Sequence, residues 1–328
     1  MDERQLRELV AETGRILLEK ELVARTWGNI SARCDENRYV ISPSGLGYEG
    51  MTGEDVPVCN LNDDTWEGNR KPSSEGKVHA AAYRVYPDVN FVIHTHQDYA
   101  TAIGLAGISG LKLSSEEEEV LGRIEVAEYG LPGTKKLSDN VKAAMKKGSK
   151  VILMKHHGVL IVGADRDDTI RKAQLLEQVC KRAVIEKLGR NDDRKPLDAI
   201  DQKLLNASVN MEVFSTPDIL YMADLGGFVT QIDDMAQMLG NRIKAVENDN
   251  DLILRELNKR DAVLVKNAGC VIMTERSDDT AALKLLIKKA AMAKRYTLAC
   301  GVDAQLSVSD CKVMRTNYVE NYSIQKDG

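Results

Sequence analysis

The stretch ILMKHHGVLI, residues 152–161, decides the fold of the first half of the chain. Two apolar runs flank a Lys-His-His-Gly segment, which predicts two buried β-strands joined by a tight turn. The stretch VLVKNAGCVI, residues 263–272, repeats this pattern with Asn267 and Ala268 in place of the two histidines. The first stretch therefore carries candidate ligands at its turn, and the second has the same pattern of apolar runs, lysine and glycine without them.

The likeness between the two stretches extends into the residues that follow. An ungapped shift of 111 residues pairs Gly158 with Gly269 and the DDT at 167–169 with the DDT at 278–280. Shared turn and capping rules alone would produce two similar units, but they do not require a DDT at a fixed distance from K-x-x-G. We therefore favour an internal duplication. The second copy is predicted to be incomplete, because GNIS, SPSG and SSE have no colinear match in it.

Length and composition restrict the class of protein. The 328 residues exceed one ordinary core and predict two domains, 1–190 and 197–328, joined by the charged linker RNDDRKP at 190–196. A net charge of −5 gives no electrostatic case for nucleic acid or an anionic membrane. The charged, helix-like start is no signal peptide, and no apolar run approaches the roughly 20 residues that span a bilayer. We expect a cytoplasmic protein whose six scattered cysteines are reduced thiols.

Hydrophobic periodicity and turn residues divide the first half into helices and strands. Strands are predicted at RYVI, at FVIHTH and on both sides of the HHG turn. Helices are predicted over 4–22, over 75–86, from an N-cap at Asp98 to Leu105, over 138–147 with Ser138 before it, and from DRDD to Gly189.

Histidine is the informative residue, because all five lie between positions 79 and 157 and the last 171 residues contain none. His94 and His96 alternate on a predicted strand, so both imidazoles point to one side of it. Two such histidines are as often hydrogen-bonded surface or core residues. A third imidazole from the HHG turn, where the histidine beside Gly158 can approach a neighbour closely, would complete three nitrogen ligands. That set suits a zinc ion with an open coordination position.

Glu75, in KPSSEGKVH, stands at a predicted helix start close in sequence to two serines. A carboxylate near a metal can take or return a proton. The alternative is charge matching to the helix dipole, which would be preferred without the histidines. His79, one helical turn later, is interpreted as a buried, hydrogen-bonded core histidine rather than a partner of the site.

Small polar residues gather at three turns, WGNIS, SPSG and PSSE. Hydroxyls, an amide and exposed backbone N–H groups at such turns can form an anion cradle, although ordinary capping would explain each turn alone. With no Walker pattern, the cradle suits a sugar phosphate more than a nucleotide. Its members are Asn29, Ser44, Gly45, Ser73 and Ser74.

The motifs GNIS, SPSG, PSSE, HTH and HHG follow one another in this order over residues 1–190. In their order and spacing the chain resembles the class II aldolase/adducin family, the group that includes L-fuculose-phosphate aldolases. The resemblance implies an α/β fold, an α/β/α layered domain with a central, mostly antiparallel sheet. Here a degenerate partial copy without metal ligands would follow it. The resemblance also implies one zinc ion, Zn²⁺, per chain on His94, His96 and His157, with other divalent metals possible.

The same resemblance implies the activity of a class II, metal-dependent aldehyde-lyase. Zinc would stabilise the enediolate as a ketose 1-phosphate splits into dihydroxyacetone phosphate and a small aldehyde. Glu75 would be the acid/base, and Asn29 with the serine and glycine turns would hold the phosphate. Tyr129, in EVAEYGLPGT, stands where family aldolases place a tyrosine that donates a proton in a neighbouring subunit's site. A structural role for this tyrosine is the alternative.

Two other readings of the same motifs stay open. One is a dehydratase or epimerase acting on a pentulose phosphate, although family epimerases usually carry Asp where Glu75 stands. The other is a non-catalytic, adducin-like scaffold, which the intact histidines oppose for the first domain. The family also forms four-fold rings with sites between subunits, so we expect a homo-oligomer. A dimer of two-copy chains could mimic such a ring, and a strictly monomeric species in light scattering would contradict it.

Overall fold

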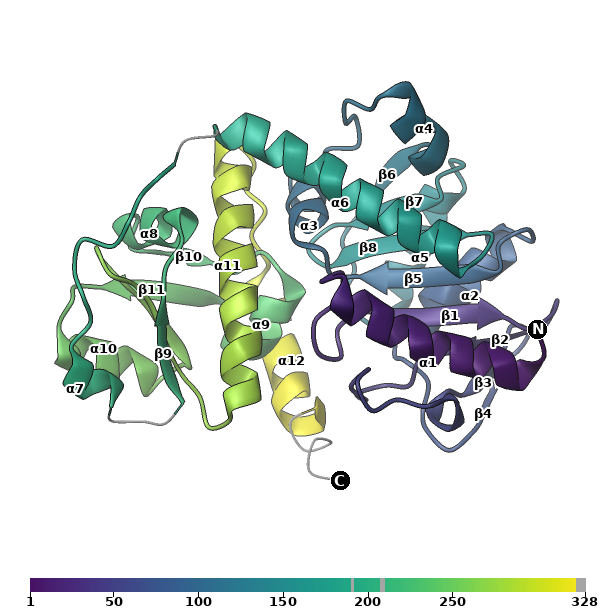
Figure 1. The fold of residues 1–328 in the computed structure, drawn as a ribbon, viewed down its shortest axis with the longest axis horizontal. Coiled ribbons are helices and arrows are strands. Elements are labelled where there is room, and N and C mark those ends of the chain that lie inside the picture. Colours follow the sequence, from purple (N-terminus) through teal and green to yellow (C-terminus); the bar gives the residue numbers. More distant parts are fainter. Residues whose placement is uncertain (190–191, 207–209, 323–328) are drawn as a thin grey trace. The chain divides into compact units, whose positions relative to one another are not determined.

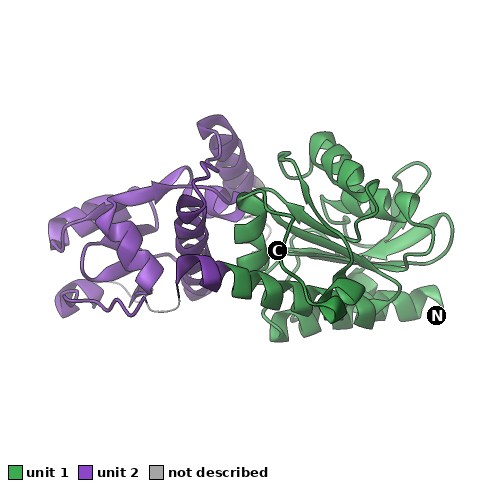
Figure 2. Cartoon of the chain, turned by 90° about the horizontal axis from the view of Figure 1, so that it is seen from above, with its two compact units in different colours: residues 1–183 green, residues 184–328 purple. Residues whose placement is uncertain are grey.

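The two strands around the HHG turn are neighbouring inner strands of a large sheet. The computed structural model describes residues 1–189, 192–206 and 210–322. The chain divides into two compact units, Met1–Ala183 and Val184–Gly328 (Figure 2). The boundary falls inside a long helix rather than in the predicted linker, of which residues 190–191 lie outside the described residues.

The sheet of unit 1 has eight strands in the order β4-β3-β2-β1-β5-β8-β7-β6. All neighbours pair antiparallel except β6 and β7, so the mostly antiparallel sheet is confirmed. The strands are β1 Asn29–Arg33, β2 Arg38–Ile41, β3 Val58–Asn60, β4 Trp66–Glu67, β5 Phe91–Thr95, β6 Ile124–Ala127, β7 Val151–Met154 and β8 Gly158–Gly163.

Helices cover both faces of this sheet (Figure 1). α1 and α6 cross one face, while α2 and α5 pack together on the other, where their apolar side chains meet those of β5 and β8 in one core. The result is the predicted α/β/α layering. The helices of this unit are α1 Glu3–Glu19, the short 3-10 turn η1 Gly53–Asp55, α2 Gly76–Val85, α3 Asp98–Leu105, α4 Ser115–Leu121, α5 Lys135–Met145 and α6 Arg166–Leu188.

Two predicted helix starts are wrong by a few residues. Asp98 is the first residue of α3 rather than its cap, because Glu177 accepts the backbone N–H groups of Tyr99 and Ala100 and satisfies the helix start from a distant segment. α5 begins before Ser138, since the Thr134 hydroxyl caps it by accepting the Leu137 N–H. Both corrections depend on capping contacts that the hydrophobic pattern does not contain.

Unit 2 contains a five-stranded sheet in the order β10-β11-β12-β13-β9. Its long helix α11 packs near this sheet and against α8. The elements are α7 Gln202–Leu205, β9 Met211–Phe214, α8 Pro217–Asp224, β10 Gly227–Val229, α9 Asp233–Leu239, β11 Arg242–Val246, α10 Asn250–Leu257, β12 Ala262–Val265, β13 Gly269–Met273, α11 Ser277–Ala299, α12 Val308–Asn317 and the π-helical turn η2 Tyr318–Tyr322.

The strand connectivity of unit 2 repeats that of one half of unit 1. The strands β11-β12-β13-β9 pair parallel, antiparallel and antiparallel, as β6-β7-β8-β5 do. Both ends of α11 lie 111 residues beyond the corresponding ends of α6. At the turns, His156 and Asn267 have φ of 68° and 60°, a left-handed conformation that Asn and His tolerate better than most residues. The strand, turn, strand and helix predicted from the sequence repeat are therefore present.

Counterparts of β1 to β4 are absent from the described part of unit 2, and β9 is an edge strand there. In unit 1 the corresponding strand, β5, has β1 on its other side. β1 begins at Asn29 of the WGNIS motif. The sequence of the second half contains no colinear match to GNIS, in agreement with the missing strands.

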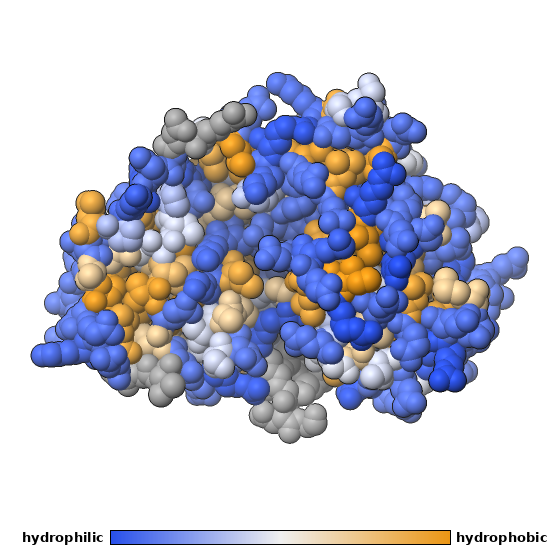
Figure 3. Space-filling model, in the orientation of Figure 1, coloured by the Kyte–Doolittle hydropathy of each residue, from blue (hydrophilic) through white to orange (hydrophobic). Residues whose placement is uncertain are grey.

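Among the described residues, no helix is long and apolar enough to cross a membrane. The face of the molecule drawn in Figure 3 is mostly hydrophilic, with apolar side chains in patches between polar ones. Such a mixture is normal, because more than half of a folded protein's surface comes from apolar atoms.

Candidate active site

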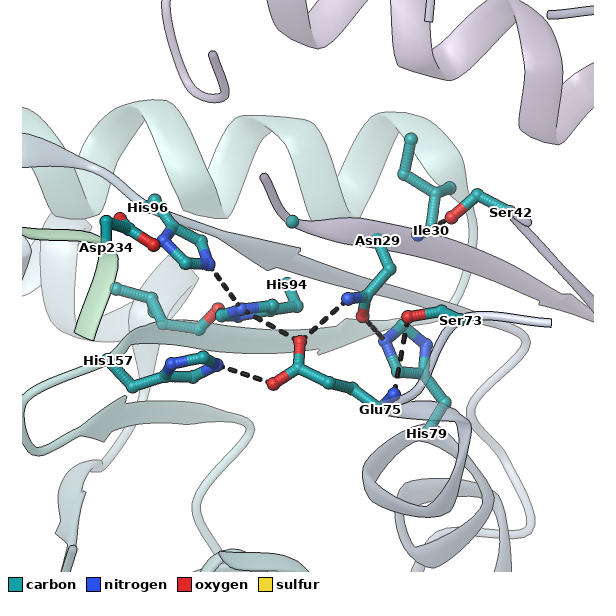
Figure 4. A network of polar contacts seen from close by, with 12 residues as sticks. Asn29, Ile30, Ser42, Ser73, Glu75, His79, His94, His96, His157 and Asp234 are labelled. Atoms are coloured by element: carbon teal, nitrogen blue, oxygen red, sulfur yellow. Dashed lines mark hydrogen bonds and ion pairs between the residues drawn. The ribbon is translucent and has the colours of Figure 1, made fainter. Parts of the chain in front are cut away.

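Three imidazoles converge at the end of β5. His94 lies in that strand, His96 follows it, and His157 comes from the turn between β7 and β8. Figure 4 shows the three rings turned toward one another. One ligand nitrogen from each lies within 4.8 Å of the others, and Nε2 of His96 is 2.8 Å from Nε2 of His94. The prediction that these histidines meet is therefore confirmed geometrically, and His156 stands outside the group.

The β5–β8 pairing places His94 and turns its Nε2 toward His96 and Glu75. Its Nδ1 donates to the backbone carbonyl of Val159 at 2.9 Å, so Nε2 carries the lone pair. Gly158 permits this approach, because a Cβ there would lie 2.4 Å from the Thr95 carbonyl oxygen and 3.0 Å from the His94 ring. Any larger residue would push the two strands and the imidazole apart.

The electrostatics of the trio suit a divalent metal. Burial lowers the pKa of His94 well below its ordinary value, although Glu75 opposes the shift. The imidazole is therefore neutral, as a metal ligand must be. The oriented Nε2 lone pair of His94, the two further imidazoles and a nearby carboxylate make the residues fit such an ion.

Glu75 lies at the N-cap position of α2, but its side chain makes no cap hydrogen bond. It turns inward instead and is only 8% exposed. One oxygen lies 2.6 Å from His157 Nε2, and the other lies 3.3 Å from His94 Nε2 and accepts from Asn29 Nδ2 at 2.8 Å. Burial raises the pKa of Glu75, but His157 and His94 outweigh this and hold it well below its usual range. The carboxylate is ionised and can accept a proton.

The two serine turns lie side by side. An isolated bridge joins Pro43 to Pro72, and the backbone N–H of Ser44 donates to the Lys71 carbonyl at 2.9 Å. Ser44 and Ser73 are half-buried. The predicted neighbours Gly45, with a left-handed φ of 73°, and Ser74, which is exposed, belong to the same two turns.

Asn29 differs from the serines because protein groups hold both ends of its amide. Its nitrogen donates to Glu75, and its oxygen lies 2.5 Å from His79 Nε2. His79 is fully buried and hydrogen-bonded, as predicted, but through Asn29 it also reaches the candidate site. Its other partner, Ser31, was not predicted, although Ser31 and Asn29 are two residues apart on β1 and share a face.

Tyr129 packs against the histidine that stays outside the trio. Its ring lies edge-on to His156, with 5.0 Å between the ring centroids. This places Tyr129 near the HHG turn.

The corresponding positions in unit 2 hold no imidazole. The β9–β13 register pairs Phe214 with Cys270, as the β5–β8 register pairs Thr95 with Val159. A Cβ on Gly269 would approach the Phe214 carbonyl oxygen to 2.5 Å, which repeats the contact at Gly158. The positions that match His94, His96 and His157 are Val213, Ser215 and Ala268.

Comparison with known proteins places these residues in a family. The model of the class II aldolase and adducin N-terminal domain matches residues 8–184. A solved L-fuculose 1-phosphate aldolase is similar at 29% identity and a TM-score of 0.53, over 56% of this chain and 86% of that one. YgbL from Klebsiella pneumoniae, named as a candidate aldolase/epimerase/decarboxylase, shares the fold at 23% identity and a TM-score of 0.51, over 60% and 93%. A sugar-phosphate aldolase from Thermotoga maritima does so at 20% and 0.50, over 57% and 97%.

The family model spans nearly all of unit 1, with its layered sheet and its three converging imidazoles. The chain belongs to the class II aldolase and adducin N-terminal domain family.

Proposed function

We propose that the chain is a zinc-dependent aldolase that cleaves a ketose 1-phosphate into dihydroxyacetone phosphate and a small aldehyde. The observation that carries this proposal is the ionised, buried Glu75, which lies against two of three convergent imidazoles. Retro-aldol cleavage needs both an electrophile for developing negative charge and a base that moves a proton. The likeness to an L-fuculose 1-phosphate aldolase supports the same reaction class.

His94, His96 and His157 would hold the metal. Three neutral imidazoles favour zinc over the harder cations, which prefer oxygen ligands. A divalent ion bound there would supply the Lewis acid that stabilises negative charge on the substrate oxygens while the C3–C4 bond breaks.

Glu75 would move the proton to or from the three-carbon fragment. Asn29 holds one of its carboxylate oxygens, which leaves the oxygen beside His157 as the mobile proton acceptor. The serine turns with Ser44 and Ser73 would bind the phosphate through hydroxyls and backbone N–H groups. Tyr129 would donate a proton to the aldehyde oxygen in the site of a neighbouring subunit.

Unit 2 is proposed to be a degenerate partial copy that binds no metal. Its repeated strand pairing and left-handed turn support a shared origin with β5 to β8. Val213, Ser215 and Ala268 offer no imidazole where the ligands would stand. A structural or assembly role within a homo-oligomer fits a copy that has kept the strand pairing and the turn but has lost the metal ligands.

The test is release of dihydroxyacetone phosphate. Zinc-loaded protein is incubated with a panel of ketose 1-phosphates, and the product is detected with an NADH-coupled glycerol-phosphate dehydrogenase. We expect release that stops after chelation and returns with zinc. Loss of water from a pentulose phosphate without triose release would show a dehydratase, and inversion at C4 without cleavage would show an epimerase. Either result would overturn the aldolase proposal.

A further inference from the structure

A chain of buried hydrogen bonds runs from the core of unit 1 to the candidate base. The Tyr83 hydroxyl lies 2.8 Å from Ser31 Oγ, which lies 2.6 Å from His79 Nδ1. His79 Nε2 lies 2.5 Å from the Asn29 side-chain oxygen, and the Asn29 nitrogen lies 2.8 Å from Glu75. Figure 4 shows the end of this chain, with the Asn29 amide bonded through its nitrogen to Glu75 and through its oxygen to His79.

The chemistry of each group fixes the direction of donation along the chain. The ionised Glu75 can only accept, so the Asn29 amide must present its NH₂ to it and its oxygen to His79. An amide oxygen carries no proton, so His79 Nε2 must donate. A neutral imidazole has one N–H, which makes Nδ1 an acceptor for the Ser31 hydroxyl. Ser31 then accepts from Tyr83, and no link in the chain is free to reverse alone.

Burial keeps this arrangement in a single protonation state. His79 and Ser31 are 0% exposed, and Tyr83 is 2% exposed. Burial lowers the pKa of His79 to about 4, with Glu75 opposing the shift, and burial raises the pKa of Tyr83 above its ordinary value. The imidazole is neutral and the phenol is protonated throughout the range in which most enzymes work.

We propose that His79 is a positioning residue that, as its Nε2–H tautomer, orients the Asn29 amide and through it the carboxylate of Glu75. With the opposite tautomer, Asn29 would turn its oxygen toward the carboxylate, and two acceptors would face each other without a proton. With the Nε2–H tautomer, the Asn29 NH₂ group donates to one Glu75 oxygen, and the other oxygen faces His157. The catalytic consequence depends on the proposed function of Glu75, whereas the tautomer itself does not.

The tautomer can be measured without a substrate. Two-bond ¹H–¹⁵N correlation spectra of the full chain distinguish the two ring nitrogens of each of its five histidines, and His79→Gln identifies the signal of interest. We expect a neutral Nε2–H pattern that stays constant from about pH 6 to 9, since the pKa of His79 is lowered to about 4. A neutral Nδ1–H form, or titration within this range, would overturn the proposal.

Activity then tests the consequence with paired variants. His79→Leu should lower kcat about 10- to 100-fold, by analogy with the range seen when a partner that orients a metal ligand is lost. KM and metal content should stay near wild type. His79→Gln, which keeps a donor toward Asn29, should recover most of the loss. Equal kcat for His79→Leu and wild type would contradict a positioning role, and so would equal losses for His79→Leu and His79→Gln.

A second pair separates this role from general packing. Tyr83→Phe removes a hydroxyl from α2, and Tyr86→Phe removes one from the residue that caps the C-terminal end of α2. The Tyr86 hydroxyl donates to the Met145 and Ser149 carbonyls, away from the site. Only Tyr83→Phe should lower kcat, and equal effects of the two would contradict the proposal. If wild type shows no cleavage, the proposed function fails, and the tautomer spectrum still decides whether His79 is held as inferred.

Discussion

Replacing His94 with alanine is expected to abolish both metal binding and turnover. His94 contributes one of three convergent imidazole nitrogens, and the Val159 carbonyl holds its ring in place. Two remaining imidazoles cannot hold zinc as three do. Loss of a ligand should therefore exceed the 10- to 100-fold affinity cost that follows loss of a group supporting a ligand.

Thermal unfolding with and without zinc measures this effect directly. Zinc at about 100 times its dissociation constant should stabilise wild type by about 2.7 kcal/mol and leave His94→Ala unchanged. The matched control is His156→Asn, because Asn267 occupies the same left-handed turn position in unit 2. This control should keep its zinc response. A zinc response of His94→Ala as large as that of wild type would mean that His94 is no ligand.

Replacing Glu75 with glutamine is expected to keep the metal and remove turnover. Glutamine has almost the same shape and can still accept from Asn29, but it cannot take a proton. Because general acid–base groups contribute about 100- to 10,000-fold, kcat should fall by that range. Zinc content should stay that of wild type, since Glu75 is not one of the three imidazole ligands.

Steady-state kinetics beside elemental analysis separates the two roles. The control is Glu116→Gln on α4, an exposed glutamate in the first turn of its helix, which should behave as wild type. If Glu75→Gln kept full turnover, the acid/base assignment would be wrong. If it lost zinc together with turnover, the carboxylate would belong to the metal site instead.

The sequence was sufficient for most of the layered domain. Apolar runs and glycine turns predicted β5, β7 and β8, and helical periodicity predicted α1, α2 and α6 close to their observed bounds. The starts of α3 and α5 were missed, because Glu177 and Thr134 satisfy those helix ends through contacts that a hydrophobic pattern does not show.

The candidate site was predictable where chemistry is encoded by spacing. The HTH motif on a strand and the HHG motif at a turn predicted that the imidazoles converge. The position of Glu75 at a helix start beside two serines made it the candidate acid/base. The support behind Asn29 was not predictable, because Ser31 and Tyr83 become its indirect partners only when β1 packs against α2. The available signals were the i, i+4 spacing of His79 and Tyr83 and the i, i+2 spacing of Asn29 and Ser31.

The two opening stretches differ in chemistry more than in structure. Both form a strand, a left-handed turn and a second strand, and in both a glycine allows the neighbouring strand to approach. Backbone geometry depends on Gly158 and Gly269 and on residues that tolerate positive φ, so it can persist after the imidazole is lost.

Metal content per chain tests the central claim most directly. The protein is purified without a histidine tag or chelator, supplied with zinc, dialysed and analysed for metal against protein concentration. The account predicts one zinc per chain, held by His94, His96 and His157 in unit 1. A chain that binds no zinc would contradict a metal site in unit 1. Two zinc ions per chain would contradict a unit 2 without metal ligands.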